Sequence, residues 1–241
     1  MSDTSPIEVL QEAGMHFGYP RTRRHPTAAP FLFGTKDRTD LFDLSKTSEC
    51  LAHAAAFAKA LAGTGKQILF VGGKNEAAIP IKEAAVRIGA PFVAGRWIGG
   101  TLTNFKNIRK RIDRLQKLTA DRESGEFQKK YTKREQLLLS REIENLEYRF
   151  GGIVSMNDLP GALFIVDPRH EDTAVKEANQ LNIPVIALLS SDCDFAKIQY
   201  PIPGNDTLQK SIRLATNAIA DAFAAGRRMS SASAERATTV S

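Results

Sequence analysis

The sequence predicts an α/β fold, in which a parallel sheet is flanked by helices and a helical hairpin is inserted into the chain. Two observations predict it. Short apolar runs, each bounded by Gly, Pro or polar residues, alternate with helical patterns; the runs lie at 67–72, 90–94, 162–167 and 183–189. Between the second and third runs, residues 104–150 follow a helical pattern alone. The alternation is typical of right-handed strand–helix–strand units packed in layers.

The strands are predicted from runs that are apolar at nearly every position. QILFVG at 67–72 and ALFIVD at 162–167 are two examples. A strand with one face in solvent alternates apolar and polar residues, whereas a strand buried on both faces does not. The runs therefore predict a parallel sheet that is covered on both faces.

The helices are predicted where apolar residues recur every three or four positions. One such stripe consists of Ala174, Ala178 and Leu181. Another pattern contains Pro80 and ends at Gly89, a residue that commonly stops helices. The four helices are predicted at 45–63, 75–89, 169–182 and 207–226.

The segment 104–150 contains two groups of apolar residues at helical spacing, separated by a polar connection that includes Gly125. The first group is Phe105, Ile108, Ile112, Leu115 and Leu118, and the second is Leu139, Ile143, Leu146 and Phe150. Each group forms a narrow stripe, which is the pattern of helices that pack in pairs. We predict an antiparallel, coiled-coil-like helical hairpin.

The chain is therefore divided into three parts. Residues 227–241 have few large apolar side chains and are predicted to be disordered. The segments FLFG and DLFDL, near the N-terminus, could form a pair of strands at the edge of the main domain. The predicted parts are an α/β domain at 1–103 and 151–226, the inserted hairpin at 104–150, and the tail.

The composition indicates a folded chain with a moderate positive charge. Apolar residues make up 42% of the 241 residues, and the net charge is +6. A charge of this sign is compatible with a polyanionic partner. Cys50 and Cys193 lack the spacing of a zinc ribbon or a disulfide framework, so we expect reduced thiols. We expect no secretory signal, because the N-terminal segment lacks a basic region followed by an apolar one. We expect no membrane span, because no apolar run approaches about 20 residues.

Enzyme motifs are weak in this sequence. FVGGKNEAA follows a predicted strand and opens a helix, as a phosphate loop does, but it lacks both common glycine patterns. Asp192, Asp194, Asn205 and Asp206 could bind Mg²⁺ if the fold brought them together. A glycine turn and an acidic, turn-forming loop explain these two segments better, and we prefer those explanations. The four histidines are scattered and form no catalytic pattern.

Basic residues gather in two segments. YPRTRRHP at 19–26 combines arginines with an aromatic residue, and Lys36 and Arg38 follow it. Residues 106–117 contain six Lys or Arg against the single Asp113, directly after RWIGGTLTNF at 96–105. Lys and Arg contact phosphates, and Thr and Asn add hydrogen bonds. Over the rest of the hairpin, acids and bases are closer to balance, which is also typical of a solvated helix face.

Several segments of the chain resemble those of a known family. They are AGMHFG at 13–18, RWIGGTLTNF at 96–105, LPGALFIVDPRHEDTAVKEANQLNIPVIAL at 159–188 and PIPGND at 201–206. In this order they are similar to the universal small-subunit ribosomal protein S-two family, in its bacterial form. The resemblance extends over residues 13 to 225. It implies a flavodoxin-like α/β domain with a protruding helical hairpin, which agrees with the periodicity.

The resemblance also implies a function. Members are non-enzymatic structural proteins at the junction of head and body of the small ribosomal subunit. They bind its RNA and neighbouring ribosomal proteins, and in bacteria they help to recruit the large multidomain mRNA-binding protein of that subunit. On the basis of the two basic segments together with the matching motifs, we predict the RNA-binding residues Arg21, Arg23, Arg24, Lys36, Arg96, Thr103, Asn104, Lys106, Arg109 and Lys110. Trp97 either packs under the hairpin or stacks on RNA.

The chain departs from the family at two places. The loop 190–195 reads SSDCDF where members usually have Asp-Thr-Asn-Cys-Asp-Pro, and Thr207 replaces an Asp. Because two carboxylates are lost, we predict no metal, and no cofactor either. We expect a cytoplasmic protein of the small subunit that does not form homo-oligomers or bind membranes. The alternatives are a nucleotide- or sugar-phosphate-binding α/β enzyme and a scaffold that binds proteins alone.

Overall fold

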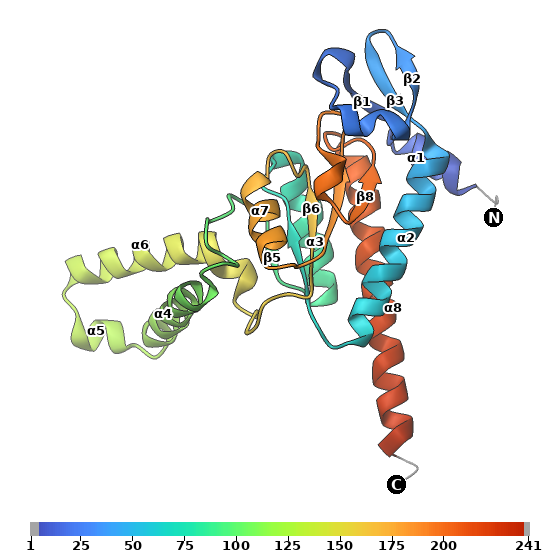
Figure 1. Ribbon diagram of the computed structural model, residues 1–241. Helices are drawn as coiled ribbons and strands as arrows, with labels where there is room; N and C mark the ends of the chain where they lie inside the picture. The colour runs from blue at the N-terminus through green and yellow to red at the C-terminus, as the bar shows by residue number, and fades with distance from the viewer. Residues whose placement is uncertain (1–4, 239–241) are drawn as a thin grey trace.

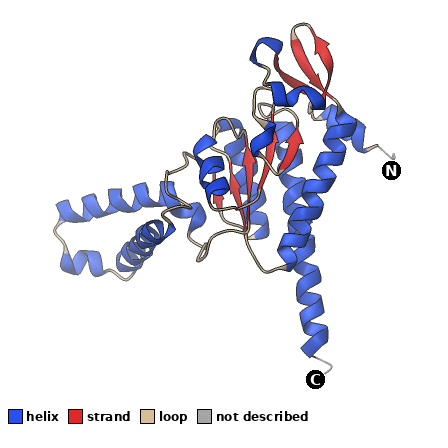
Figure 2. Cartoon of the chain, in the orientation of Figure 1, coloured by secondary structure: helices blue, strands red, loops and turns tan. Residues whose placement is uncertain are grey.

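A five-stranded parallel sheet forms the centre of the molecule in the computed structural model, which describes residues 5–238 (Figure 2). Its strands are arranged in the order β5-β4-β6-β7-β8. Numbered along the chain, this order is 2-1-3-4-5, the doubly wound order of flavodoxin-like folds. The strands are β4 (Ile68–Val71), β5 (Phe92–Val93), β6 (Ala162–Val166), β7 (Val185–Leu189) and β8 (Tyr200–Pro203).

Every residue of β4, β6 and β7 is buried, as the apolar runs predict. Alternate side chains point to opposite faces, so each strand contributes to two apolar cores. Leu69 and Leu163 belong to one core, while Phe70 and Phe164 belong to the other. Strand β8 was not predicted, because its sequence YPIP contains two prolines, which lack N–H donors. It lies at the edge of the sheet, where prolines are tolerated.

Three helices cover one face of the sheet, and α7 (Asp172–Gln180) covers the other together with the base of the hairpin (Figure 1). The three are α2 (Leu44–Gly63), α3 (Asn75–Ile88) and α8 (Gln209–Thr238). The predicted α/β class with a parallel sheet flanked by helices is therefore confirmed.

Helix α8 differs from the sequence prediction of a disordered tail from residue 227. It continues to Thr238, and in Figure 1 it extends beyond the body of the molecule. Once its first half is packed against α2, each further residue adds a hydrogen bond without the cost of starting a helix. Residues 239–241, the end of the predicted tail, lie outside the described part of the chain.

The segment 104–150 protrudes from the sheet as a helical hairpin (Figure 1). Its helices are α4 (Phe105–Glu123), the short α5 (Glu126–Lys130) in the connection, and α6 (Lys133–Phe150). The predicted stripes face each other, and Ile112, Leu118 and Ile143 are buried between the helices. The hairpin therefore has an apolar seam of its own that is continuous with one core of the α/β body.

A second, three-stranded sheet lies beside the carboxyl end of the parallel sheet. It contains β1 (Phe17–Pro20), β2 (Leu32–Lys36) and β3 (Thr39–Phe42) in the order β1-β3-β2 and follows α1 (Pro6–Glu12). The expected strand pair is β2 and β3, whereas β1 was not predicted. Ser191, just after β7, holds this sheet in place, because it accepts hydrogen bonds from the backbone N–H groups of Tyr19 and His25. None of the helices described is long and apolar enough to cross a membrane.

Candidate nucleic-acid interface

The segment 96–104 joins the sheet to the hairpin and is organised by one buried carboxylate, that of Glu177 in α7. Both oxygens of this carboxylate accept hydrogen bonds. Oε1 accepts from the Trp97 indole at 3.1 Å and from the Gly100 N–H at 2.7 Å. Oε2 accepts from the N–H groups of Leu102 and Thr103 at 2.9 and 3.1 Å, and from the Thr103 hydroxyl at 3.2 Å. The segment 96–104 is thus held by hydrogen bonds to a single negative charge.

These donors keep Glu177 ionised. Burial by itself would raise the pKa of Glu177, but the hydrogen bonds from Thr103, Leu102, Trp97 and Gly100 lower it below its ordinary value. The sequence contained a signal for this role, since position 177 is three residues after Ala174 and lies on the apolar stripe of α7. A carboxylate on that stripe needs partners inside the protein.

Trp97 packs into the core and does not face the solvent. Its side chain is 7% exposed, and its indole N–H is already bonded to Glu177. Of the two alternatives for this residue, the structure shows packing under the hairpin base. Gly100, which follows, has φ +88°, a conformation that side chains rarely adopt, and a Cβ there would lie 3.2 Å from Asn104.

The predicted residues at the hairpin base fall into two groups. Arg96, Asn104, Lys106 and Lys110 are exposed. Among residues 5–238, no ion pair engages the side chains of Arg96, Lys106 or Lys110. The other group is engaged by partners inside the protein: Thr103, although exposed, is bonded to Glu177. Arg109 donates to the Val154 and Met156 carbonyls at 3.2 Å and pairs with Asp113.

The same division holds in the N-terminal basic segment. Arg21 and Lys36 are exposed. Arg24 forms an ion pair with the fully buried Asp40 and donates to the Thr35 hydroxyl at 2.9 Å. Burial would raise the pKa of Asp40, but the hydrogen bonds from Arg24 and Thr35 and the charge of Arg24 lower it. Arg24 therefore fastens the loop to β2 and β3.

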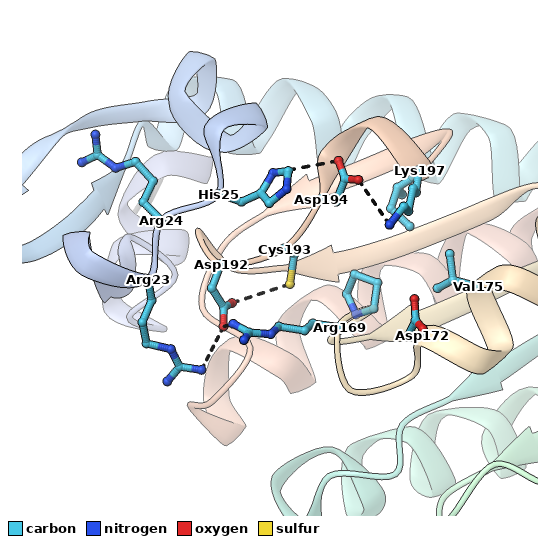
Figure 3. A pocket seen from close by; sticks show the side chains of 12 residues that line it. Arg23, Arg24, His25, Arg169, Asp172, Val175, Asp192, Cys193, Asp194 and Lys197 are labelled. Atoms are coloured by element: carbon cyan, nitrogen blue, oxygen red, sulfur yellow. Dashed lines mark hydrogen bonds and ion pairs between the residues drawn. The ribbon is translucent and has the colours of Figure 1, made fainter.

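Arg23 shares a partner, Asp192, with Arg169, a residue after β6 that the sequence did not indicate (Figure 3). Both guanidinium groups donate to Oδ2 of Asp192, at 3.1 Å from Arg23 and 2.7 Å from Arg169. Asp192 is buried, while both arginines remain half exposed. They line a cavity of about 480 Å³ at the carboxyl edge of the sheet. Because Arg23 and Arg169 share the single charge of Asp192, the three groups together leave a positive charge at the rim of the cavity.

The loop between β6 and α7 connects the two basic groups. Arg169 lines the cavity beside Arg23, and the next residue, His170, lines a second cavity of about 660 Å³ beside Arg96. The carboxyl edge of a doubly wound sheet is where such folds bind ligands. The N-terminal loop and the hairpin base therefore lie at the two sides of one edge.

The phosphate-loop position of this edge is already filled. The Gly73 N–H, which leads into α3, donates to Oε1 of Glu171 at 3.0 Å, and the His170 ring lies 2.8 Å from the same oxygen. Glu171 is 3% exposed. A Cβ on Gly73 would lie 2.6 Å from that carboxylate. Because the protein supplies its own anion here, a nucleotide phosphate would have to displace a buried side chain.

The acidic residues that could bind a metal surround a lysine. Asp167, Cys193 and Asp206 place their ligand atoms within 4.8 Å of one another. The Lys74 ammonium pairs with Asp167 and lies 3.3 Å from Asp206. Burial and the charge of Asp167 raise the pKa of Asp206 to about 7. Lys74 therefore supplies positive charge among these carboxylates.

Comparison with known proteins identifies the family. The family model described as ribosomal protein S2 matches residues 10–226. The chain belongs to the ribosomal protein S2 family. Three curated relatives carry the name small ribosomal subunit protein uS2. The relative from Syntrophobacter fumaroxidans is 45% identical over 222 residues, which cover 92% of this chain and 81% of the relative.

The other two relatives are similar over nearly the same length. That from Mesoplasma florum is 42% identical over 222 residues, covering 92% of this chain and 83% of its own. That from Coprothermobacter proteolyticus is 42% identical over 221 residues, covering 92% and 82%. The resemblance inferred from the sequence motifs is confirmed, and with it the prediction of a small-subunit ribosomal protein rather than an enzyme.

Proposed function

We propose that this S2-family chain binds the RNA of the small ribosomal subunit in the cytoplasm, with the carboxyl edge of its sheet and the hairpin base facing the RNA. One observation carries the proposal. Arg96, Lys106 and Lys110 are exposed cations on or directly after a segment whose backbone is fixed by Glu177. A rigid, positively charged surface loses little conformational entropy when it binds a polyanion.

Whether a predicted residue contacts RNA directly depends on whether its side chain already has a partner inside the protein. We assign phosphate contacts to the exposed residues Arg21, Lys36, Arg96, Asn104, Lys106 and Lys110. Arg24, Thr103 and Arg109 act by holding the surface in shape. Arg23 shares both roles, because it is bonded to Asp192 and half exposed.

The protein partners follow from the resemblance. They are neighbouring ribosomal proteins and the large multidomain mRNA-binding protein of the subunit, whose recruitment supports translation initiation. Leu137 and Leu138 on α6 support a protein contact at the hairpin, since each is more than half exposed. The chain enters the subunit as a single copy and not as a homo-oligomer.

Cosedimentation with small subunits depleted of this protein, at increasing salt, tests the proposal. Binding should weaken with salt as counterions are released from the RNA. Arg96→Ala with Lys106→Ala should lower the slope of log affinity against log salt by about 2 and leave the fold intact. The matched control replaces Lys59 and Arg87 with Ala, because both lie on helices of the opposite face and neither lines the cavities beside Arg96.

Each rival predicts a different result. An enzyme of the same fold would stay in the supernatant. A scaffold that binds only proteins would cosediment even after Arg96 and Lys106 are replaced. Equal salt slopes for the double variant and its control would contradict the placement of the RNA surface.

A further inference from the structure

Tyr148, in the last turn of α6, is 77% exposed beside the segment 96–104. Its ring lies close to Gly95, because a Cβ on Gly95 would be 3.8 Å from the Tyr148 hydroxyl. The ring lines two cavities, of about 580 and 660 Å³, and Gly95 and Arg96 line both of them. An aromatic face, a glycine that adds no bulk and a guanidinium thus meet at one place.

The cations around Tyr148 are not neutralised by partners. Lys82 and Arg149 line the first cavity together with Arg96, and among residues 5–238 none of the three forms an ion pair. Two of the nearby acids are engaged: Glu83 pairs with Arg213, and Glu171 accepts from Gly73. Glu147 is the remaining acid that lines the cavity. The surroundings of the ring therefore carry a net positive charge.

This combination matches a nucleotide better than a protein side chain. Exposed tyrosine rings stack on bases, and arginine contacts the phosphate beside them. A base inside a duplex has both faces covered by its neighbours, so only an unpaired base can reach the ring. An apolar protein partner would cover the ring but leave the cations without counterions.

We propose that the hollow beside Tyr148 binds one unpaired nucleotide of ribosomal RNA, with the base stacked on Tyr148 and the phosphate against Arg96. The site rests on the proposed RNA-binding function and extends it from phosphate contacts to a base contact. Lys82 and Arg149 add charge on one side of the ring, and His170 lies in the cavity on the other.

Binding of the full chain to deproteinised small-subunit RNA tests the site. Tyr148→Leu should weaken binding by at least about fivefold, because stacking contributes about 1–3 kcal/mol per base. Tyr148→Phe should bind like the wild type, since it keeps the ring. Tyr131→Leu, near the hairpin tip, is the matched control and should have no effect. Circular dichroism checks that all variants fold.

Ultraviolet crosslinking gives a direct readout. Trypsin should release Tyr148 in the peptide 142–149, where it is the single tyrosine. We expect this peptide to carry a crosslinked nucleotide in the wild type and in Tyr148→Phe. Wild-type RNA binding with an unaffected Tyr148→Leu variant would overturn the site alone, whereas no RNA binding by the wild type would overturn the proposed function as well. Normal RNA binding by Tyr148→Leu with failed entry into subunits would assign the hollow to a protein neighbour.

Discussion

Glu177 and Asp206 are both buried carboxylates beside the parallel sheet, but their surroundings have opposite effects. Glu177 accepts hydrogen bonds from uncharged donors on both oxygens, and its pKa is lowered. Asp206 shares Lys74 with Asp167, and one of its oxygens is buried without a hydrogen-bond partner among the described residues. Burial and the like charge of Asp167 raise its pKa to about 7.

The difference shows how a carboxylate can serve as a structural anchor. Neutral N–H groups stabilise the ionised form without bringing a further charge into the interior. In return, Glu177 fixes the backbone of a surface segment that the sequence predicts to face RNA. The Lys74 cluster joins charged groups from three strand ends, and like charges inside it oppose each other. We therefore expect Glu177 to contribute more to stability than Asp206.

Replacement of Glu177 should have the larger effect. Glu177→Gln removes the charge and replaces one accepting oxygen with an NH₂ group. This NH₂ group faces the N–H groups that donated to that oxygen, so these buried donors lose their acceptor. We expect a loss of about 3 kcal/mol in the free energy of unfolding, measured with urea. The difference from wild type should shrink as the pH falls below about 4.5, because the unfolded chain then takes up a proton on Glu177 that the folded protein binds only at lower pH.

Glu142→Gln is the control for this variant, because Glu142 is exposed and pairs with Arg114 on the hairpin surface. It should cost less than about 1 kcal/mol. If the two variants lost equal stability, Glu177 would be no more than a surface charge.

Replacement of Asp206 should have a smaller effect that depends on pH. Between about pH 4 and pH 7 the folded protein holds a proton on Asp206 that the unfolded chain has released. The free energy of unfolding of the wild type therefore falls as the pH rises through this range. Asp206→Asn cannot titrate. From pH 5 to pH 8 its stability relative to wild type should therefore rise, on the order of 2 kcal/mol. A constant or falling difference would show that the pKa of Asp206 is not raised.

The sequence predicted the parts of the fold that depend on local pattern. Apolar runs located β4 and β6, and helical spacing located the hairpin. Strand β8 was missed because its prolines hide the pattern, and its pairing with β7 is a long-range contact. The extension of α8 was missed because residues 227–238 have few large apolar side chains, so the pattern that predicts the helix at 207–226 stops before the helix itself does.

The candidate site was predicted less completely, for a physical reason. The sequence shows which residues are cationic but not which of them have a partner inside the protein. Arg24 and Lys106 look alike in the sequence, yet Arg24 is bonded to a buried aspartate and Lys106 is exposed. Glu177 was overlooked because an acid in an amphipathic helix usually faces water, and its donors lie more than seventy residues earlier in the chain.

Hydrogen exchange of the free protein tests most directly the central claim, which is that Glu177 holds the segment 96–104 in place before RNA binds. The backbone amides of Gly100, Leu102 and Thr103 donate to this carboxylate. They should exchange slowly in the wild type and at least about tenfold faster in Glu177→Gln, while the amides of β6 keep their protection. Exchange of these three amides at the rate of an open loop in the wild type, or at the same slow rate in both proteins, would contradict the account.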